Sequence, residues 1–456
     1  MYFVSQLLFM DFERFLAWDE AIYTSEVSRF GDAVYLDAHR ARGVTLIVAP
    51  VVQWTDSILA MRVYLAAVSV SGLFLSFLPW VRIIEWAAPT AAAIFGLSWV
   101  AVFYGSEVMP NLFAALFVAA AAGLAVGYSK APSSALLFGV AGAVAATAII
   151  RPLDGAAALA GLATIPVIFR NRVAWRAVAG GAVGLVVGLV PWLIEAWARF
   201  GGPLARLERT RGLVGGGVHN NVFEYLRLLD GPLSGPDRNP DIPWPGVAWL
   251  CLLLALALVG LLLGGGDHRR IAGLALTCSM FLAAPYLILS EAAAPRFLLP
   301  ALVLLTVGAS IGLLTLAGSV AATARPIVVV GMTAALALFN LGALTTISAE
   351  QSAARARGLL LAKALEARSE AGSCYFLSSS GYPQISFATG CDGSRFTGQF
   401  DRDQARLTEA YENGLEPYVL ANNPDHLLAL QESWDCESIT ELSDRNWHLC
   451  RRGEDP

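Results

Sequence analysis

The chain has 456 residues, of which 56% are hydrophobic and only 15% are charged, and its formal net charge is −5. Soluble domains are about 45–50% apolar and about 25% charged, so this composition excludes an ordinary soluble protein. The small net charge gives no reason to expect a nucleic-acid partner. The mean hydropathy of +0.58 predicts an integral membrane protein.

Apolar segments long enough to cross a membrane follow one another along most of the chain. A helix of about 20 apolar residues spans a hydrocarbon core of about 30 Å. The candidate spans are 62–80, 88–104, 112–128, 134–150, 153–169, 177–198, 246–264, 272–290, 297–317 and 326–346. The short segment 1–10 lacks the basic start of a cleavable signal peptide, and we read it as part of one more span. We therefore predict an all-α transmembrane bundle of about 10–11 spans.

The basic residues of the short loops predict the orientation of this bundle. Alternate loops hold Arg82, Lys130, Arg170, Arg172, Arg176, Arg269, Arg270 and Arg325. By the positive-inside rule these loops face the cytoplasm. The outer set is then 11–61, 105–111, 151–152, 199–245, 291–296 and everything after 346. We therefore expect the long loops, the unusual polar residues and the C-terminus outside a bacterial plasma membrane.

The last part of the chain changes in character after the predicted transmembrane domain 1–346. An alternation of Ala and Leu with charged residues over 351–370 indicates an amphipathic helix. Short strands are expected at Cys374–Leu377 and Pro417–Leu420, and helices at Asp401–Asn413 and Pro424–Trp434. Residues 347–456 are therefore predicted to form a small extracytoplasmic α/β domain.

Cysteines concentrate in this C-terminal region. Four of the six are Cys374, Cys391, Cys436 and Cys450. An even number in an oxidising compartment predicts two disulfides, and closeness in sequence favours Cys374–Cys391 and Cys436–Cys450. Four free thiols in a cytoplasmic tail are the alternative. A zinc site is less favoured, because no Cys-x-x-Cys spacing occurs and His426 is far from His448 in sequence.

Two adjacent carboxylates, Asp19 and Glu20, follow the first apolar segment. At a membrane surface the lower polarity raises a carboxylate pKa, which suits a general base for an acceptor hydroxyl or amine. The alternative is the first turn of an interfacial helix, where Asp and Glu are usual. The two carboxylates alone favour that alternative.

Further ionisable residues lie in the outer links. Glu107 is in the short link 105–111, Arg151 precedes a proline at the outer end of a span, and Arg296 opens another span. The positive-inside bias does not explain outward arginines, whereas the planar guanidinium fork suits a phosphate. Each arginine alone can also snorkel or pair with a carboxylate, as Arg296 with Glu291. Acids and arginines on one face together indicate a site.

Other candidate ligands of a phosphate or a sugar are His219, in the long loop 199–245, and His39 and Arg42, in the first outer segment. The glycine run 215–217 before His219 allows that loop to close over a ligand. The alternative is a basic surface loop that lies along anionic headgroups. The sequence does not separate these two interpretations.

Taken in order, these residues resemble the GT-C superfamily of integral-membrane glycosyltransferases, in particular the protein O-mannosyltransferase and aminoarabinose-transferase type. The matching segments are Asp19–Tyr23, Arg40–Pro50, Glu107, Arg151-Pro152 and Arg296–Pro300. The resemblance covers about residues 11–320, and the tail fits the soluble outer domain in which many members end. No sugar-specific motif accompanies these segments.

The resemblance implies a polyprenyl-phosphate sugar as donor, reached from within the lipid bilayer, and an acceptor that it does not identify. Asp19 would be the catalytic base, and Glu20 or Glu107 would orient the acceptor or bind a divalent metal, as in metal-dependent members. Arg151 and Arg296 would hold the departing lipid phosphate, which is chemically coherent because fixed positive charge stabilises that leaving group.

Two rival functions remain. A transporter or flippase of an amphipathic lipid-linked substrate would place ionisable residues at mid-membrane and show matching broken helices. Here the centres of the spans are almost free of charge, and Asp154 and Glu195 lie near span ends, which favours an enzyme. An assembly protein whose C-terminal domain binds a partner would tolerate replacement of the outer acids and arginines.

Overall fold

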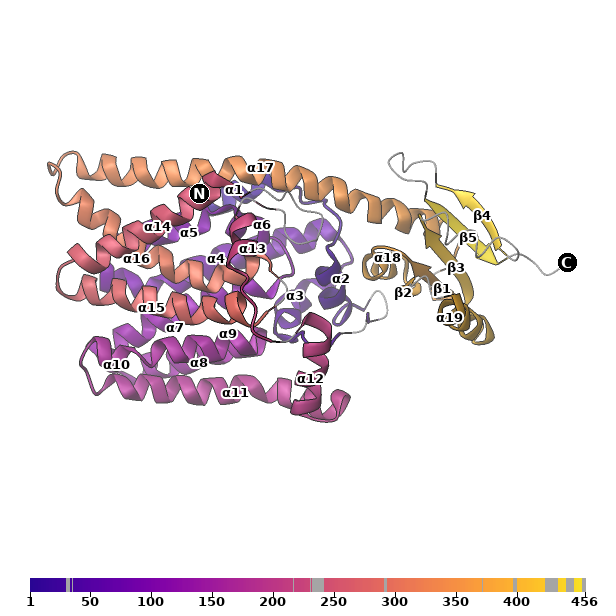
Figure 1. The fold of residues 1–456 in the computed structure, drawn as a ribbon, viewed down its shortest axis with the longest axis horizontal. Coiled ribbons are helices and arrows are strands. Elements are labelled where there is room, and N and C mark those ends of the chain that lie inside the picture. The colour runs from indigo at the N-terminus through magenta and orange to yellow at the C-terminus, as the bar shows by residue number, and fades with distance from the viewer. Residues whose placement is uncertain are drawn as a thin grey trace. The chain divides into compact units, whose positions relative to one another are not determined.

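The computed structural model describes residues 1–29, 33–34, 36–215, 217–229, 231, 242–290, 293–370, 372–396, 400–422, 434–439 and 447–452. The chain divides into two compact units (Figure 1). The helical unit comprises Met1–Met10, Asp37–Val44 and Arg62–Ser348, and the mixed unit comprises Asp11–Leu36, Thr45–Met61 and Ala349–Pro456. We describe each unit by itself.

Helices make up most of the described chain. They are α1 (Tyr2–Phe9), α2 (Trp18–Ser25), α3 (Gly43–Val52), α4 (Ile58–Ile84), α5 (Ala87–Gly96), α6 (Trp99–Tyr104), α7 (Pro110–Lys130), α8 (Ser134–Ile150), α9 (Pro152–Leu162), α10 (Ile165–Ile168), α11 (Ala174–Phe200), α12 (Pro203–Val214), α13 (Val222–Arg227), α14 (Trp244–Leu263), α15 (Gly266–Ile288), the 3-10 helix η1 (Pro295–Leu298), α16 (Leu299–Ala317), α17 (Arg325–Glu366), α18 (Tyr382–Thr389) and α19 (Phe400–Glu412).

Among the described residues, seven helices are long and apolar enough to cross a membrane. They are α4, α7, α11, α14, α15, the continuous η1–α16 segment and α17, and four shorter apolar segments are α3, α5, α8 and α9–α10. Each candidate span predicted from the sequence coincides with helix. The number of long helices is below the predicted 10–11 because several spans are short or broken, and the segment 1–10 forms only the eight-residue α1.

Two predicted spans are interrupted. The span 88–104 is divided into α5 and α6 at Leu97–Ser98, where the Ser98 hydroxyl accepts a hydrogen bond from the Ala101 N–H at 3.4 Å and begins a new helix. The span 153–169 is divided into α9 and α10 at Ala163–Thr164. The sequence showed only continuous apolar runs here, because hydropathy does not register a local cap.

Small residues bring the helices of the helical unit into contact. A Cβ at Gly312 of α16 would lie 1.7 Å from the Leu256 carbonyl oxygen of α14, and one at Gly184 of α11 would lie 2.1 Å from the Ala141 carbonyl oxygen of α8. Only glycine permits such close backbone approach, which is the usual means of helix association in membranes. Larger side chains, among them Leu253 of α14, fill the rest of the α14–α16 interface.

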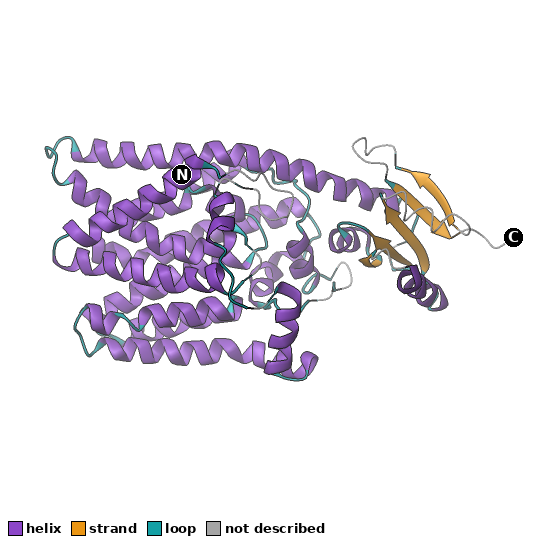
Figure 2. Ribbon diagram, viewed as in Figure 1, coloured by secondary structure: helices purple, strands orange, loops and turns teal. Residues whose placement is uncertain are grey.

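The mixed unit contains a five-stranded sheet, drawn in orange in Figure 2. Its strands are β1 (Cys374–Ser378), β2 (Asp392–Arg395), β3 (Glu416–Ala421), β4 (Trp434–Ser438) and β5 (His448–Arg452), in the spatial order β2-β1-β3-β5-β4. β1 is parallel to β2 and β3, whereas β5 is antiparallel to β3 and β4. The predicted fold class, a helical membrane bundle with a small C-terminal α/β domain, is confirmed.

The elements predicted for the C-terminal region can be compared one by one. The strands expected at Cys374–Leu377 and Pro417–Leu420 are β1 and β3, and the helix expected at Asp401–Asn413 is α19. The helix expected at Pro424–Trp434 lies outside the described residues except for Trp434, which begins β4. The domain boundary after residue 346 stays a prediction.

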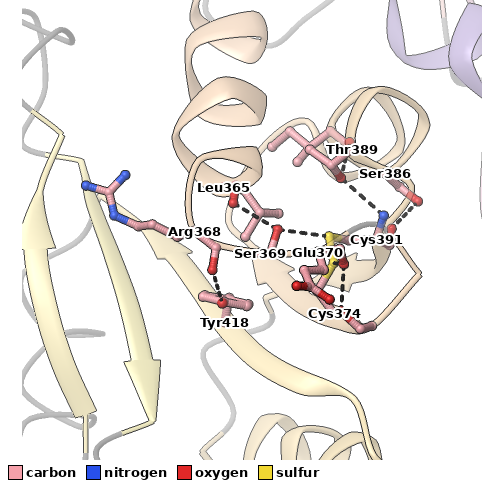
Figure 3. Close-up of a disulfide and its surroundings, with 11 residues drawn as sticks. Leu365, Arg368, Ser369, Glu370, Cys374, Ser386, Thr389, Cys391 and Tyr418 are labelled. Carbon is pink, nitrogen blue, oxygen red and sulfur yellow. Dashed lines mark hydrogen bonds between the residues drawn. A yellow bond between two sulfur atoms is a disulfide. The ribbon is translucent and has the colours of Figure 1, made fainter.

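Two disulfides stabilise the sheet domain. They join Cys374 to Cys391 and Cys436 to Cys450, the pairing that closeness in sequence favours (Figure 3 shows the first). Cys436 and Cys450 face each other across the β4–β5 ladder. The core beside the sheet is formed by the buried side chains of Phe15, Leu361, Leu365, Phe376, Ile385, Tyr418, Leu420, Trp447 and Leu449.

Candidate functional site

Several helix termini meet at one end of the helical unit. α8 ends and α9 begins at the Arg151 corner, α7 begins at Pro110, and α15 ends at Ile288. η1 packs against α6, α7, α15 and α16. Because neighbouring helices run in alternate directions, the links 105–111, 151–152 and 293–296 of the helical unit lie at this end. Glu107, Arg151 and Arg296 are therefore brought to the same end of one unit.

The corner between α8 and α9 fixes the backbone of Arg151. Its N–H donates to the Thr147 carbonyl at 2.7 Å, which closes α8, and its carbonyl accepts from the Gly155 N–H at 3.0 Å, which opens α9. Pro152 is the first residue of α9, a position that needs no N–H donor. Arg151 thus belongs to two helix ends at once, and its side chain leaves from a rigid support.

The Arg151 side chain is held by a buried carboxylate and a phenol. Nε lies 2.7 Å from Oδ2 of Asp154, a residue one helical turn further along the chain. The Asp154 side chain is fully buried. Nη2 donates to the Tyr286 hydroxyl at 2.5 Å, and that hydroxyl donates to Oδ1 of Asp154 at 2.5 Å. Charge-assisted hydrogen bonds of this kind are strong and directional. The guanidinium is therefore oriented, while its side chain keeps 18% exposure.

Arg151 and Arg296 share one aromatic ring. The guanidinium carbon of Arg151 lies 5.3 Å from the ring centroids of both Tyr286 and Phe297, and that of Arg296 lies 5.1 Å from Phe297. The two rings are stacked, with centroids 5.4 Å apart. Ring faces attract cations within about 6 Å. Tyr286 and Phe297 thus lie against two guanidiniums, of which that of Arg151 is paired with the Asp154 carboxylate. Glu291, the partner considered for Arg296, lies outside the described residues.

The loop 199–245 supplies a phenol next to these arginines. Tyr225 of α13 is buried, and burial raises its pKa to about 12, while the charges of Arg151 and Arg296 oppose that rise. The loop is fastened to the end of α15, because the Asn221 N–H donates to the Leu287 carbonyl at 3.0 Å. We infer that this part of the loop covers the arginine pair.

His219 lies in the same fastened loop segment. Its N–H donates to the carbonyl of Ile288 at 2.7 Å, and the Asn221 side chain donates to the carbonyl of Ser290. The His219 side chain is half-buried. The structure therefore places His219, a predicted ligand, at the C-terminal end of α15. Tyr286 lies in the last turn of the same helix.

The segment 37–44 lies against the end of α8. A Cβ at Gly43 would lie 2.4 Å from the Cα of Ile150, so only glycine fits there. The neighbouring Arg42 pairs with Glu195 of α11 at 2.8 Å. Arg42 thus reaches the same end of the unit as Arg151, where it pairs with a carboxylate.

Arg206 of α12 holds the segment 37–44 in place. It is fully buried, donates to the carbonyls of Ala38 at 3.0 Å and Arg40 at 2.8 Å, and pairs with Glu195 at 2.9 Å. Burial lowers its pKa, and the Glu195 carboxylate opposes this effect. His39 is exposed between the two carbonyls that Arg206 binds.

Glu107 lies in the link between α6 and α7 and is fully buried. The Met109 N–H donates to its carbonyl at 2.8 Å, and Nη1 of Arg62, also fully buried, donates to the carbonyl of the preceding Ser106 at 2.8 Å. The carboxylate therefore lies at the site end of the unit but within the packed interior. Its role toward an acceptor stays a prediction.

Asp19 and Glu20 belong to the mixed unit, where they form the first turn of α2. Oε2 of Glu20 accepts from the Ala17 N–H at 2.9 Å and from Nη1 of Arg355 at 3.2 Å. These contacts match the alternative in which the acidic pair begins a helix. Asp19 is half-buried. Its role as a base, and any role of Glu20 in the chemistry, stay predictions.

In the part of the chain that the structure describes, no group of three or more His, Cys, Asp or Glu side chains is arranged to hold a metal ion. Glu20, one of the two carboxylates considered as metal ligands, already binds Arg355. Binding of a divalent metal by Glu20 or Glu107 stays a prediction.

Sequence reasoning missed several residues of this site. Asp154 was noted only as lying near a span end, although its spacing of three from Arg151 is that of a helical pair. Tyr286 had no distinguishing signal, whereas Phe297 was singled out only as part of the segment Arg296–Pro300, and Arg206 only as one of several arginines in the loop 199–245. An aromatic residue in an apolar helix is usually core, and one arginine in a basic loop is not distinguishable from its neighbours.

The fold has counterparts among solved structures. The structure is similar to ArnT from Cupriavidus metallidurans in the apo state, with a TM-score of 0.69 and 13% identity, over 99% of this chain and 97% of that chain. It is also similar to the same protein bound to undecaprenyl phosphate, with a TM-score of 0.70 and 13% identity, over 100% and 98%.

A more distant likeness is to the apo oligosaccharyltransferase of Archaeoglobus fulgidus, with a TM-score of 0.52 and 11% identity, over 92% of this chain and 68% of that chain. No protein-family model and no curated protein matches the sequence. At these identities the similarity shows a shared fold, an ArnT-like one, as the sequence resemblance led us to expect.

Proposed function

We propose that this protein is a membrane glycosyltransferase that moves a sugar from a polyprenyl-phosphate donor to an acceptor. The observation that carries the proposal is the pairing of Arg151 and Arg296 on the Phe297 ring at one end of the helical unit. The shared fold supports it, because the similar protein ArnT has been solved with undecaprenyl phosphate bound.

The arginine pair suits the leaving group of such a reaction. When the acceptor attacks the anomeric carbon, the bond from that carbon to the phosphate oxygen breaks, and its electron pair stays on the lipid phosphate. Charge therefore develops where Arg151 and Arg296 can donate hydrogen bonds. Asp154 and Tyr286 hold Arg151 before the substrate arrives, which reduces the reorganisation needed during the reaction.

The proton that the acceptor loses needs a base, and we assign this role to Asp19. The assignment follows the resemblance of Asp19–Tyr23 to the acidic motif of the GT-C enzymes. Asp19 is half-buried, whereas the Glu20 side chain is fully buried and bound to Arg355. A base must reach the attacking group, so the more accessible carboxylate fits the role better.

We further propose that the reaction occurs on the extracytoplasmic face of a bacterial plasma membrane. The basic short loops 130–134 and 170–176 and the start of α15 lie at the end of the helical unit opposite to Arg151, where Lys130 pairs with Asp267 at 2.9 Å. Cytoplasmic enrichment of such loops supports this orientation. The two disulfides fit the same assignment for the sheet domain.

The proposal is tested by sugar transfer in membranes supplied with labelled polyprenyl-phosphate sugars. We expect Asp19→Asn, Arg151→Ala and Arg296→Ala each to reduce transfer strongly. Arg227→Ala is the matched control, because Arg227 lies on the same outer loop but pairs with Glu224 at 2.8 Å. If the three variants transfer sugar as fast as the unaltered protein, this mechanism is wrong. That result would favour a transporter or an assembly protein.

A further inference from the structure

The acidic motif is held by the C-terminal sheet domain within the mixed unit. α2 packs against α18. The ring of Trp18 meets that of Tyr382 edge to face, with centroids 4.9 Å apart. The Gln384 carboxamide, oriented to satisfy both of its polar atoms, accepts from the Trp18 N–H at 3.1 Å and donates to the Gly381 carbonyl at 3.0 Å. The residue before Asp19 is therefore fixed through both its backbone and its ring.

A second anchor fixes the residue after Asp19. Nη1 of Arg355, on α17, lies 3.2 Å from Oε2 of Glu20 and 3.4 Å from the Phe15 carbonyl oxygen. Glu20 is fully buried and Arg355 is 7% exposed. A buried charge pair of this kind is sensitive to geometry, because either charge left alone in the interior is costly. Asp19 thus lies between two anchored neighbours.

The disulfide Cys374–Cys391 ties α18 to the sheet. It joins the first residue of β1 to the segment between α18 and β2. The Ser386 hydroxyl of α18 donates to the Cys391 carbonyl at 2.8 Å, and the Ser369 hydroxyl lies 3.5 Å from the Cys391 sulfur (Figure 3). α18 is therefore a firm support for α2.

We propose that Arg355, Tyr382 and Gln384 are positioning residues that orient Asp19 through α2, with Glu20 as the ion-pair partner that receives Arg355. The C-terminal sheet domain then contributes to catalysis by positioning α2, and it is not only an appended binding module. This inference rests on the proposed function, in which Asp19 is the general base. It assigns to Glu20 a positioning role in place of a chemical one.

The physical basis is the short reach of an aspartate. Its carboxylate is separated from the backbone by one methylene group, so its position follows the backbone of α2 closely. Displacement of a catalytic group by about 1 Å can cost about a hundredfold in rate. Anchors on Trp18 and Glu20 limit that displacement, which is the function that supporting contacts have around a catalytic group.

The kinetic test uses the full chain in lipid nanodiscs with the variants Arg355→Met and Tyr382→Leu. We expect kcat for sugar transfer to fall about ten- to a hundredfold, with unchanged KM for the donor and unchanged binding of undecaprenyl phosphate. Arg355→Lys should recover part of the rate. The matched controls are Arg357→Met, two residues along α17, and Tyr411→Leu, at an exposed position on α19, and both should transfer sugar normally.

A second measurement tests the contacts that hold α2 and does not depend on enzymatic activity. Hydrogen exchange of the α2 amides should be faster in Arg355→Met and Tyr382→Leu than in the unaltered protein, and unchanged in the two controls. If the unaltered protein transfers no sugar, the proposed function fails, while the exchange rates still report whether α18 and Arg355 hold α2.

Three outcomes would overturn the inference. The first is normal transfer by both anchor variants. The second is unchanged exchange of the α2 amides in both. The third is that the milder Gln384→Ala loses binding of undecaprenyl phosphate along with transfer, because that result would reveal general damage to the protein in place of a displaced Asp19.

Discussion

Nε of Arg151 lies 2.7 Å from Oδ2 of Asp154, and the Asp154 side chain is fully buried. Asp154 therefore depends on Arg151 for charge compensation, while Arg151 is oriented by Asp154. The pair links folding to the proposed chemistry, since the guanidinium that neutralises a buried carboxylate is also the one that we propose to bind a phosphate. Replacement of either residue has to be judged by stability as well as by binding.

Arg151→Ala should lower the free energy of unfolding by about 3–5 kcal/mol, because the buried Asp154 carboxylate loses the guanidinium that compensates its charge. Thermal unfolding in detergent measures this loss. The double variant Arg151→Ala/Asp154→Leu should regain stability but not the binding of undecaprenyl phosphate. If the double variant binds this lipid normally, Arg151 serves only to neutralise Asp154.

Phe297→Leu should weaken undecaprenyl phosphate binding without disturbing the fold, because it removes the ring that both arginines contact. A cation–π contact contributes about 0.5–2 kcal/mol, so a loss of about two- to thirtyfold in affinity is expected. Phe297→Tyr keeps the ring and should bind nearly as well. Equal affinity of the Leu variant and the unaltered protein would show that the shared ring has no part in holding the arginines.

Arg206→Met should release the segment 37–44, because it removes two hydrogen bonds to the backbone of that segment and an ion pair with Glu195. Limited trypsin digestion would detect the change as faster cleavage after Arg40 or Arg42. Arg209→Met, one turn along α12, is the control and should leave cleavage unchanged. Unaltered cleavage in both variants would contradict the role we give to Arg206.

Removal of the disulfide Cys374–Cys391 by double serine substitution should destabilise the sheet domain by about 3 kcal/mol, as expected for a closed loop of about 15 residues. The disulfide Cys436–Cys450 closes a loop of similar length, so its removal should cost about as much. Only the first change is expected to speed hydrogen exchange in α2, because only that disulfide ties α18 to the sheet. Equal exchange in both variants would contradict this distinction.

Tyr225 predicts a pH dependence at the alkaline end. Its pKa is raised to about 12 by burial, so an unfolded chain loses this proton near pH 10 while the folded protein keeps it. The stability from the neutral phenol is complete below pH 10 and is lost as the pH rises toward 12, by about 2–3 kcal/mol. Tyr225→Phe should therefore lose less stability between pH 10 and 12 in denaturant unfolding. Identical pH profiles of the two proteins would contradict the burial of a neutral phenol.

Local sequence determined the membrane character, the positions of the candidate spans and the short strands of the sheet domain. Each depends on features that a single segment carries by itself, namely the length of an apolar run or an alternation of side chains. The disulfide pairing was also within reach, because each pair is close in sequence and has one candidate partner nearby. Arg151 and Arg296 stood out because a charge at the outer end of a span has few topological reasons to be there.

The tertiary structure alone decided which of these residues act together. Arg151, Tyr286 and Phe297 come from three elements, and their contacts require the packing of whole helices. The same holds for Glu20, whose ion-pair partner Arg355 is 335 residues away in sequence. Hydropathy and spacing record what one segment prefers, whereas such contacts depend on how distant segments fill space together. For this reason the sequence singled out the two arginines that we propose to bind phosphate, but not the groups that hold them.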